Sequence, residues 1–333
     1  TADDMFFIAN SAINVAGINL TGGMQLEGTL TGTVANGVRL SDGSSLRLRE
    51  AVVPEGIPLS VDAGATVDVN SANGATTVNG SLKIGAGATL NVTPSQPITF
   101  NGAVTNAGTF VQATGGNIYF DCPELVGGTY EVRGNHFWFG GAIDSPESEI
   151  AIRGASASTG IIIFGAQSTL PGTGLPNFKS INVTGPFAEA RFMPRAACEI
   201  TNSLYDAVVA NAGIVFIDSV EHAAATVTVK NATWTTKGDF RLGSVDGRGS
   251  YLKIADGATL TVASGHGLYT ANGVSNPYEN VLEVASGGVL NYPGAEDPVV
   301  ADIIVYRGKV IAGDVQSTRL DGFMQGLDYP ETA

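Results

Sequence analysis

Short runs in which apolar and polar residues alternate recur along residues 21–132, each directly after a turn of small residues. In the copy at 87–92, which reads GATLNV, Leu90 and Val92 alternate with polar residues. Strict alternation is typical of a half-buried β-strand, and glycine and asparagine adopt the backbone conformations that tight corners need. The pattern predicts many short strands joined by tight corners, and no stretch shows convincing helical periodicity.

The strand-and-turn unit repeats at a nearly constant interval. Aligned on the third residue of each copy, the units lie at positions 24, 45, 66, 89, 109 and 129, with spacings of 21, 21, 23, 20 and 20 residues. A short fixed period built from strands and turns is typical of a solenoid. We therefore predict an all-β fold, a single-stranded parallel β-helix (β-solenoid) with about 20–30 residues per rung, a rung being one turn of the solenoid.

The regularity of the repeat divides the chain into successive segments. The expected order is an N-terminal strand, cap or donor segment at 1–20, a β-helix at 21–292 and a C-terminal hairpin or cap with its tail at 293–333. Within the β-helix we expect regular rungs at 21–132, wider irregular rungs at 133–222 and rungs again at 223–292.

Both ends of the predicted solenoid carry apolar, strand-like residues. The end of a solenoid is an unpaired sheet edge, which has to be covered or used for association. We expect the N-terminal segment either to cap the first rung or to pair with another subunit, and the C-terminal segment to form a hairpin about Arg307 and Gly308. The candidate interface residues are Met5, Phe6, Phe7 and Ile8 at one end and Ile303, Ile304, Val305 and Tyr306 at the other.

Composition narrows the classes of partner. Of the 333 residues 44% are hydrophobic and 14% charged, which is apolar enough for an ordered chain. The net charge of −14 argues against nucleic acid and against anionic membrane surfaces as partners. There is no run of 18 apolar residues, so we expect no transmembrane segment.

Cysteine usage and the first residues bear on the cellular compartment. Cys122 and Cys198 lie 76 residues apart and match no metal or redox motif. They form either one disulfide or two buried thiols, and we favour thiols because cysteine is among the residue types most often buried. The chain begins with Thr1 rather than methionine, which fits a secreted protein after removal of its signal peptide. We expect an extracellular or cell-surface location.

Few residues in the sequence indicate a catalytic site. Between Val69 and Phe120 the only charged residue is Lys83, so this stretch cannot supply an acid and a base. The three histidines show no ligand spacing, and we expect no metal, no cofactor and no enzymatic activity. The best carbohydrate-facing candidates lie in the irregular middle: Asp121, Glu131, Arg133, His136, Trp138, Asp144, Arg153, Arg191 and Arg195.

Within that group, an exposed Trp138 beside His136 would be able to stack on a sugar ring, with Arg153 as a further glycan contact. The competing interpretation is that Trp138 and its phenylalanine neighbours fill a wide rung or an interface.

The copies GATLNV at 87–92 and AGTF at 107–110, with their Asn-Gly corners, resemble the passenger repeats of bacterial autotransporter-type surface proteins. The resemblance covers 21–132 well and 220–292 in part. It implies a right-handed parallel β-helix outside the cell, and the handedness rests on the resemblance alone. Similar repeats serve adhesins, surface layers, filaments and some enzymes.

The leading hypothesis is a structural subunit of a secreted or cell-surface assembly that polymerises with copies of itself through its β-helix ends and N-terminal strand. The alternative is a carbohydrate-binding or carbohydrate-cleaving β-helix with its site in the middle rungs, and surface glycans are then its partners. A monomeric adhesin is a third interpretation.

Overall fold

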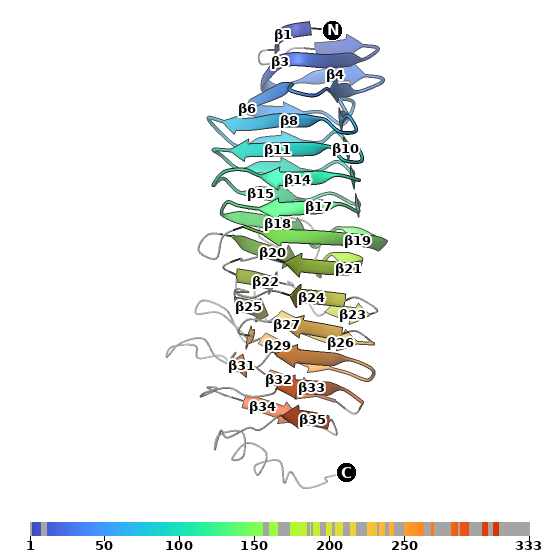
Figure 1. Ribbon diagram of the computed structural model, residues 1–333, viewed down its shortest axis with the longest axis vertical. Helices are drawn as coiled ribbons and strands as arrows, with labels where there is room; N and C mark the ends of the chain where they lie inside the picture. Colours follow the sequence, from blue (N-terminus) through green and yellow to red (C-terminus); the bar gives the residue numbers. More distant parts are fainter. Residues whose placement is uncertain are drawn as a thin grey trace.

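The structure is a computed structural model, and it describes residues 2–7, 12–155, 160–165, 174–184, 187, 189–193, 198–201, 204–208, 214–217, 225–231, 233–236, 240–242, 250–262, 268–269, 281–285, 287–292, 302–305 and 309–312. All regular secondary structure in these residues is β-strand. The strands stack rung upon rung into an elongated solenoid, with β1 at one end and β34 and β35 at the other (Figure 1).

Three ladders of parallel strands form the faces of the solenoid. Face 1 is the longest, and its strands are, in stacking order, β1 (Ala2–Phe7), β3 (Ile18–Thr29), β6 (Ser45–Val53), β8 (Thr66–Ala72), β11 (Thr89–Pro94), β14 (Thr109–Gln112), β17 (Thr129–Val132), β19 (Asp144–Gly154), β21 (Asn177–Thr184), β24 (Leu204–Val208), β27 (Thr233–Thr236), β30 (Thr259–Val262), β33 (Val289–Tyr292) and β35 (Lys309–Ala312).

Face 2 follows face 1 along each rung. Its strands are the end of β6, then β9 (Thr76–Val78), β12 (Ile98–Phe100), β15 (Ile118–Phe120), β18 (His136–Gly140), β20 (Ile161–Gly165), β22 (Glu189–Met193), β25 (Ile214–Ile217), β28 (Phe240–Leu242) and β31 (Leu268–Tyr269).

Face 3 completes the rung in two series. The first consists of the start of β3, β5 (Val38–Leu40), β7 (Leu59–Val61), β10 (Leu82–Ile84), β13 (Val104–Asn106) and β16 (Leu125–Val126). The second consists of β23 (Cys198–Thr201), β26 (Ala225–Lys230), β29 (Ser250–Ile254), β32 (Val281–Val284) and β34 (Asp302–Val305). A separate parallel pair joins β2 (Ala12–Val15) to β4 (Thr31–Val34). The all-β solenoid predicted from the sequence is confirmed.

The apolar alternation, rather than the position of the turn glycines, sets the register of the rungs. Thr66, Thr89, Thr109 and Thr129 pair in consecutive strands, as the repeat alignment requires. The alignment is wrong for the first copies, however, because Met24 pairs with Leu46 rather than with residue 45. A slip of one residue would turn every buried side chain of a strand outward, so the buried Met24 and Leu46 determine the pairing.

The two ends also differ in part from expectation. The predicted C-terminal hairpin is wrong, because β34 pairs in parallel with β32 on face 3 whereas β35 pairs in parallel with β33 on face 1. A short apolar run on each side of a glycine gives the same pattern for a hairpin and for a solenoid corner. At the other end β1 lies on β3 of its own chain, with Met5 opposite Met24. Ile8 and Tyr306 lie outside the described residues.

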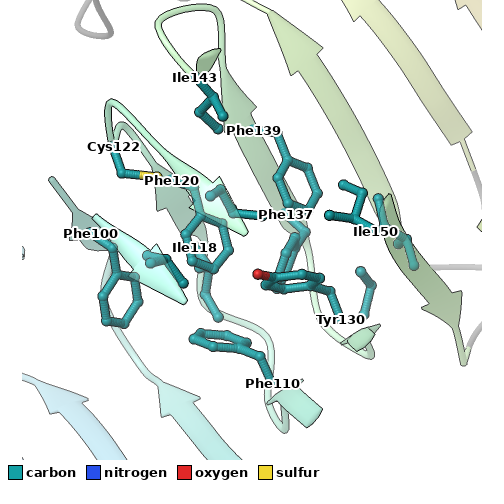
Figure 2. Packing of buried hydrophobic residues seen from close by; sticks show 14 of the residues in the cluster. Phe100, Phe110, Ile118, Phe120, Cys122, Tyr130, Phe137, Phe139, Ile143 and Ile150 are labelled. Carbon is teal, nitrogen blue, oxygen red and sulfur yellow. The ribbon is translucent and has the colours of Figure 1, made fainter. Parts of the chain in front are cut away.

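The interior is organised around a column of stacked phenylalanine rings on face 2. Successive rungs contribute Phe100, Phe120, Phe139, Phe164 and Phe192, with neighbouring ring centroids 5.5, 5.5, 5.5 and 5.0 Å apart. Figure 2 shows Phe120 between Phe100 and Phe139, in contact with the rings from face 1. Because identical positions recur on successive rungs, the rings lie at a separation that favours offset stacking.

Buried polar side chains hold the corners beside this core. Gln112 is buried, donates from Nε2 to Gly116 O (2.6 Å) and accepts at Oε1 from Gly134 N (3.2 Å). Asn106 accepts at Oδ1 from Gly108 N (2.9 Å). A buried side-chain amide is tolerated here because it forms hydrogen bonds with backbone groups at the corners, which have no partner in a neighbouring strand.

We predict that Phe120→Ala lowers the free energy of unfolding by about 3–5 kcal/mol, because it removes a buried ring and leaves a cavity in the column. The change is measured from the urea midpoint, followed by far-ultraviolet circular dichroism. The matched control is Thr105→Ala, at an exposed position of face 3, and its midpoint should stay close to that of the parent chain. Equal midpoints for the two variants would contradict the packing described for the column.

Candidate functional site

The middle rungs hold most of the sequence candidates, and the structure distributes these candidates over different faces. Trp138 and His136 lie in β18 on face 2, whereas Arg153 lies in β19 on face 1, opposite Glu131. The three residues predicted to contact a glycan therefore do not converge on one surface. Within the described residues, no group of three or more His, Cys, Asp or Glu side chains is arranged to hold a metal ion.

Trp138 does not form the exposed aromatic platform that glycan stacking needs. Its side chain is only 8% exposed, and its Nε1 donates to Gly165 O (2.9 Å). Strand register places Tyr119 on one side of it and Ile163 on the other, both on the outer surface of face 2. Cross-strand contacts between such side chains bury them. Trp138 is therefore buried in an outer cluster, whereas its neighbours Phe137 and Phe139 lie in the interior of the rung, as the competing interpretation expects of them.

Around Trp138 lies a small outer apolar cluster with a polar margin. The cluster consists of Trp138 and Ile163, with Tyr119, Ile161 and Met193 packed against them. At its margin Arg191 forms an ion pair with Glu189 (Nη2 to Oε2, 2.5 Å). Burial and then the positive charge of Arg191 lower the pKa of His136, while Glu189 opposes them. His136 is therefore neutral at neutral pH and suited to hydrogen bonding rather than to binding anions.

The other sequence candidates are engaged in local contacts or lie outside the described part. Arg133 donates from Nε to Glu131 Oε1 (2.6 Å) on face 1. The exposed Asp144 accepts from Asn177 Nδ2 (2.8 Å). Arg195 lies outside the described residues. The first contact lies at the end of β17 and the second joins β19 to β21, and neither pairs two carboxylates across a cleft.

Cys122 is a free, buried thiol. Burial raises its pKa to about 12, so the thiol stays protonated and unreactive at neutral pH. Cys122 therefore agrees with the expectation of a buried thiol. Cys198 lies in β23, several rungs further along the chain, and its side chain is outside the described part.

The two ends of the solenoid provide the clearest candidate site. Within the described residues β1 pairs only with β3, and β35 pairs only with β33. Each therefore presents one edge of backbone N–H and C=O groups to whatever lies beyond it. Both strands belong to face 1 and are parallel to it, so the first and last edges of one continuous ladder face in opposite directions along the molecule (Figure 1).

These ends contain most of the interface residues predicted from the sequence. Met5, Phe6 and Phe7 lie in β1, and Ile303, Ile304 and Val305 lie in β34, the end strand of face 3. The sequence interpretation missed β35 as an edge, because it assigned residues 309–311 to the second arm of a hairpin. The apolar Val310 and Ile311 were the available signal for a further rung.

Trp138→Ala should lower the free energy of unfolding by about 3 kcal/mol, because it removes the centre of the outer cluster and a buried hydrogen bond. Trp138→Phe should cost less, because it keeps an aromatic ring and loses the hydrogen bond to Gly165. Arg153→Ala, at an exposed position, serves as the control with an unchanged urea midpoint. If Trp138→Ala left the midpoint unchanged, the structural role of this side chain would be refuted.

The described residues contain no helix that is long and apolar enough to cross a membrane. Comparison of the chain with protein-family models, with curated proteins and with solved structures gives no match. The strand pairing itself defines the β-solenoid architecture.

Proposed function

We propose that the protein is a structural subunit that polymerises end to end with copies of itself, in a filament, surface layer or adhesive appendage outside the cell. The observation that carries the proposal is the pair of edge strands β1 and β35, which are the first and last described strands of the same parallel ladder. A second copy placed beyond β35 adds its β1 in the same direction, so the ladder continues across the junction without a change of pattern.

The contacts at such a junction are of the kind that hold successive rungs together. Each added strand contributes backbone hydrogen bonds, and the strands of face 3 add a second edge through β34. The rungs are separated by about 4.8 Å, so the junction needs only the ordinary spacing between neighbouring strands. A head-to-tail contact of this kind does not close on itself, and it therefore generates an open polymer.

Charges in the two end strands of face 1 favour the head-to-tail arrangement, whereas the last strand of face 3, β34, begins with the acidic Asp302. β1 contains Asp3 and Asp4, whereas β35 begins with Lys309. Opposite charges at a head-to-tail junction attract, whereas a head-to-head junction would bring four aspartates together. The proposal needs no catalytic residue and no cofactor. Glycan binding is the weaker alternative, because its predicted aromatic platform is buried.

The experiment blocks one edge at a time. Phe6→Pro in β1 and Val310→Pro in β35 each remove a backbone donor from an edge strand, which proline cannot replace. We expect the parent chain to form large species with rising concentration in sedimentation velocity, and both proline variants to remain single folded chains. Phe6→Tyr and Val310→Thr are the matched controls, and they should assemble like the parent chain.

A mixture distinguishes a blocked edge from a damaged fold. A folded chain blocked only at β1 still offers β35, so a small proportion of it should end the growth of parent polymers and shorten them. A parent chain that stays monomeric at every concentration would refute the proposal. Proline variants that polymerise as well as the parent would also refute it.

A further inference from the structure

A column of polar side chains lies at the corner that follows face 2. Asn79, Asn101 and Asp121 come directly after the last residues of β9, β12 and β15. The backbone N–H of Asn79 donates to Val53 O (2.8 Å), that of Asn101 to Val78 O (2.8 Å) and that of Asp121 to Phe100 O (2.9 Å). The three residues thus occupy one position on three successive rungs, and we call them the corner ladder.

The lower two members show that side chains at this position reach one another. Asn101 Nδ2 donates to Asn79 Oδ1 (2.9 Å). The same backbone pairing repeats one rung further, so Asp121 occupies above Asn101 the position that Asn101 occupies above Asn79. An amide-to-amide hydrogen bond between rungs is therefore the natural contact at this corner, and Asp121 occupies the next place in the series.

Two oxygens of the corner ladder have no hydrogen-bond donor. Asn101 Oδ1 and Asp121 Oδ1 are both buried, and neither has a partner within the described residues. An ionised aspartate is an acceptor only, so it cannot bond to the Asn101 oxygen. A buried acceptor without a donor is unfavourable, and two of them at adjacent places of one ladder require a common explanation.

Among the described residues, no cationic side chain contributes to the pKa shift of Asp121. The adjacent Cys122 is a neutral buried thiol, and the other charged group that acts on this thiol, Glu124, is a second acid. The rung below contributes the neutral Asn101, and the rung above contributes Gly140, where an added Cβ would lie 3.5 Å from Asp121 Oδ1. Burial is the sole cause that raises the pKa of Asp121, to about 6.

We propose that, in a mildly acidic medium, Asp121 is protonated in the folded solenoid and donates its proton to Asn101 Oδ1. The corner ladder then runs without interruption from Asp121 through Asn101 to Asn79, and each member donates to the one below. One proton bound at a single carboxyl thus completes the hydrogen bonding of three rungs. The stability of this corner therefore depends on pH.

The direction of the pH dependence follows from the two states of Asp121. Its pKa is about 6 in the folded chain. An aspartate in an unfolded chain has a pKa of about 3.9. The folded state therefore binds the proton more tightly, and this stabilisation is fully present below about pH 4 and is lost as the pH rises through about 6. The corner is strongest in a mildly acidic medium.

The test compares urea midpoints at about pH 5 and about pH 8. Protonation of Asp121 should raise the urea midpoint of the parent chain at the lower pH relative to the higher pH. Asp121→Asn, which supplies a permanent amide donor, should lack this contribution, and its midpoint should be above that of the parent chain at the higher pH. Asn101→Ala should reduce the same pH-dependent contribution to the urea midpoint, because it removes the oxygen that accepts the proton of Asp121. Asp68→Asn, at an exposed position of face 1, should keep the parent's pH dependence.

A titration of the aspartate side-chain carboxyl carbons by NMR provides a direct readout of the proton. One carboxyl titrating near pH 6 that is absent from Asp121→Asn is the expected result. The proposal is overturned if every aspartate titrates near its ordinary value, or if Asp121→Asn retains the full pH dependence of the parent. Equal stabilisation of the parent chain at the higher pH by added Ca²⁺ or Na⁺ would also overturn it, because a cation would then fill the place of the proton.

Discussion

The backbone hydrogen bonds between successive rungs constrain every other feature of this protein. They require each rung to superimpose on the one before it, so a given position along the rung has the same surroundings at every level. Residues whose side chains suit self-stacking then form continuous columns, as Phe100, Phe120 and Phe139 do inside the solenoid. Asn79 and Asn101 do the same at a corner. Within the described residues the same ladder starts at β1 and finishes at β35, each of which pairs on one side only.

The sequence was sufficient to predict the all-β solenoid, because the repeat period and the apolar alternation report directly on rungs and strands. The four threonines from Thr66 to Thr129 show this, since their spacing in the sequence is their register in the structure. The alignment failed at the first copies, where the turn glycines and the buried residues indicate registers that differ by one residue. Burial determines the pairing there. In the same way, local sequence could not separate a hairpin from a corner at β34 and β35, because both follow from apolar runs around a glycine.

The candidate sites were less predictable than the fold, because they depend on which residues meet across rungs. Trp138 was the strongest glycan candidate from its type and its neighbours, yet the strands on either side bring Tyr119 and Ile163 against it and bury it. In the sequence Asp121 was one of several carbohydrate-facing candidates, and nothing there indicated a role at a corner. Its importance emerges only from its place above Asn101, where the regular stacking leaves two acceptors without a donor. The ends were predictable as apolar strands, whereas their membership of one common ladder required the structure.

The central claim is that the face 1 ladder continues from one chain to the next. Cryo-electron microscopy of the concentrated protein tests it most directly, because it resolves the junction between subunits as well as the presence of a polymer. The account predicts polar filaments in which β35 of one copy pairs in parallel with β1 of the next at the ordinary strand spacing of about 4.8 Å. Single rods at all concentrations would contradict it, as would filaments whose subunits meet head to head or without strand pairing at the junction.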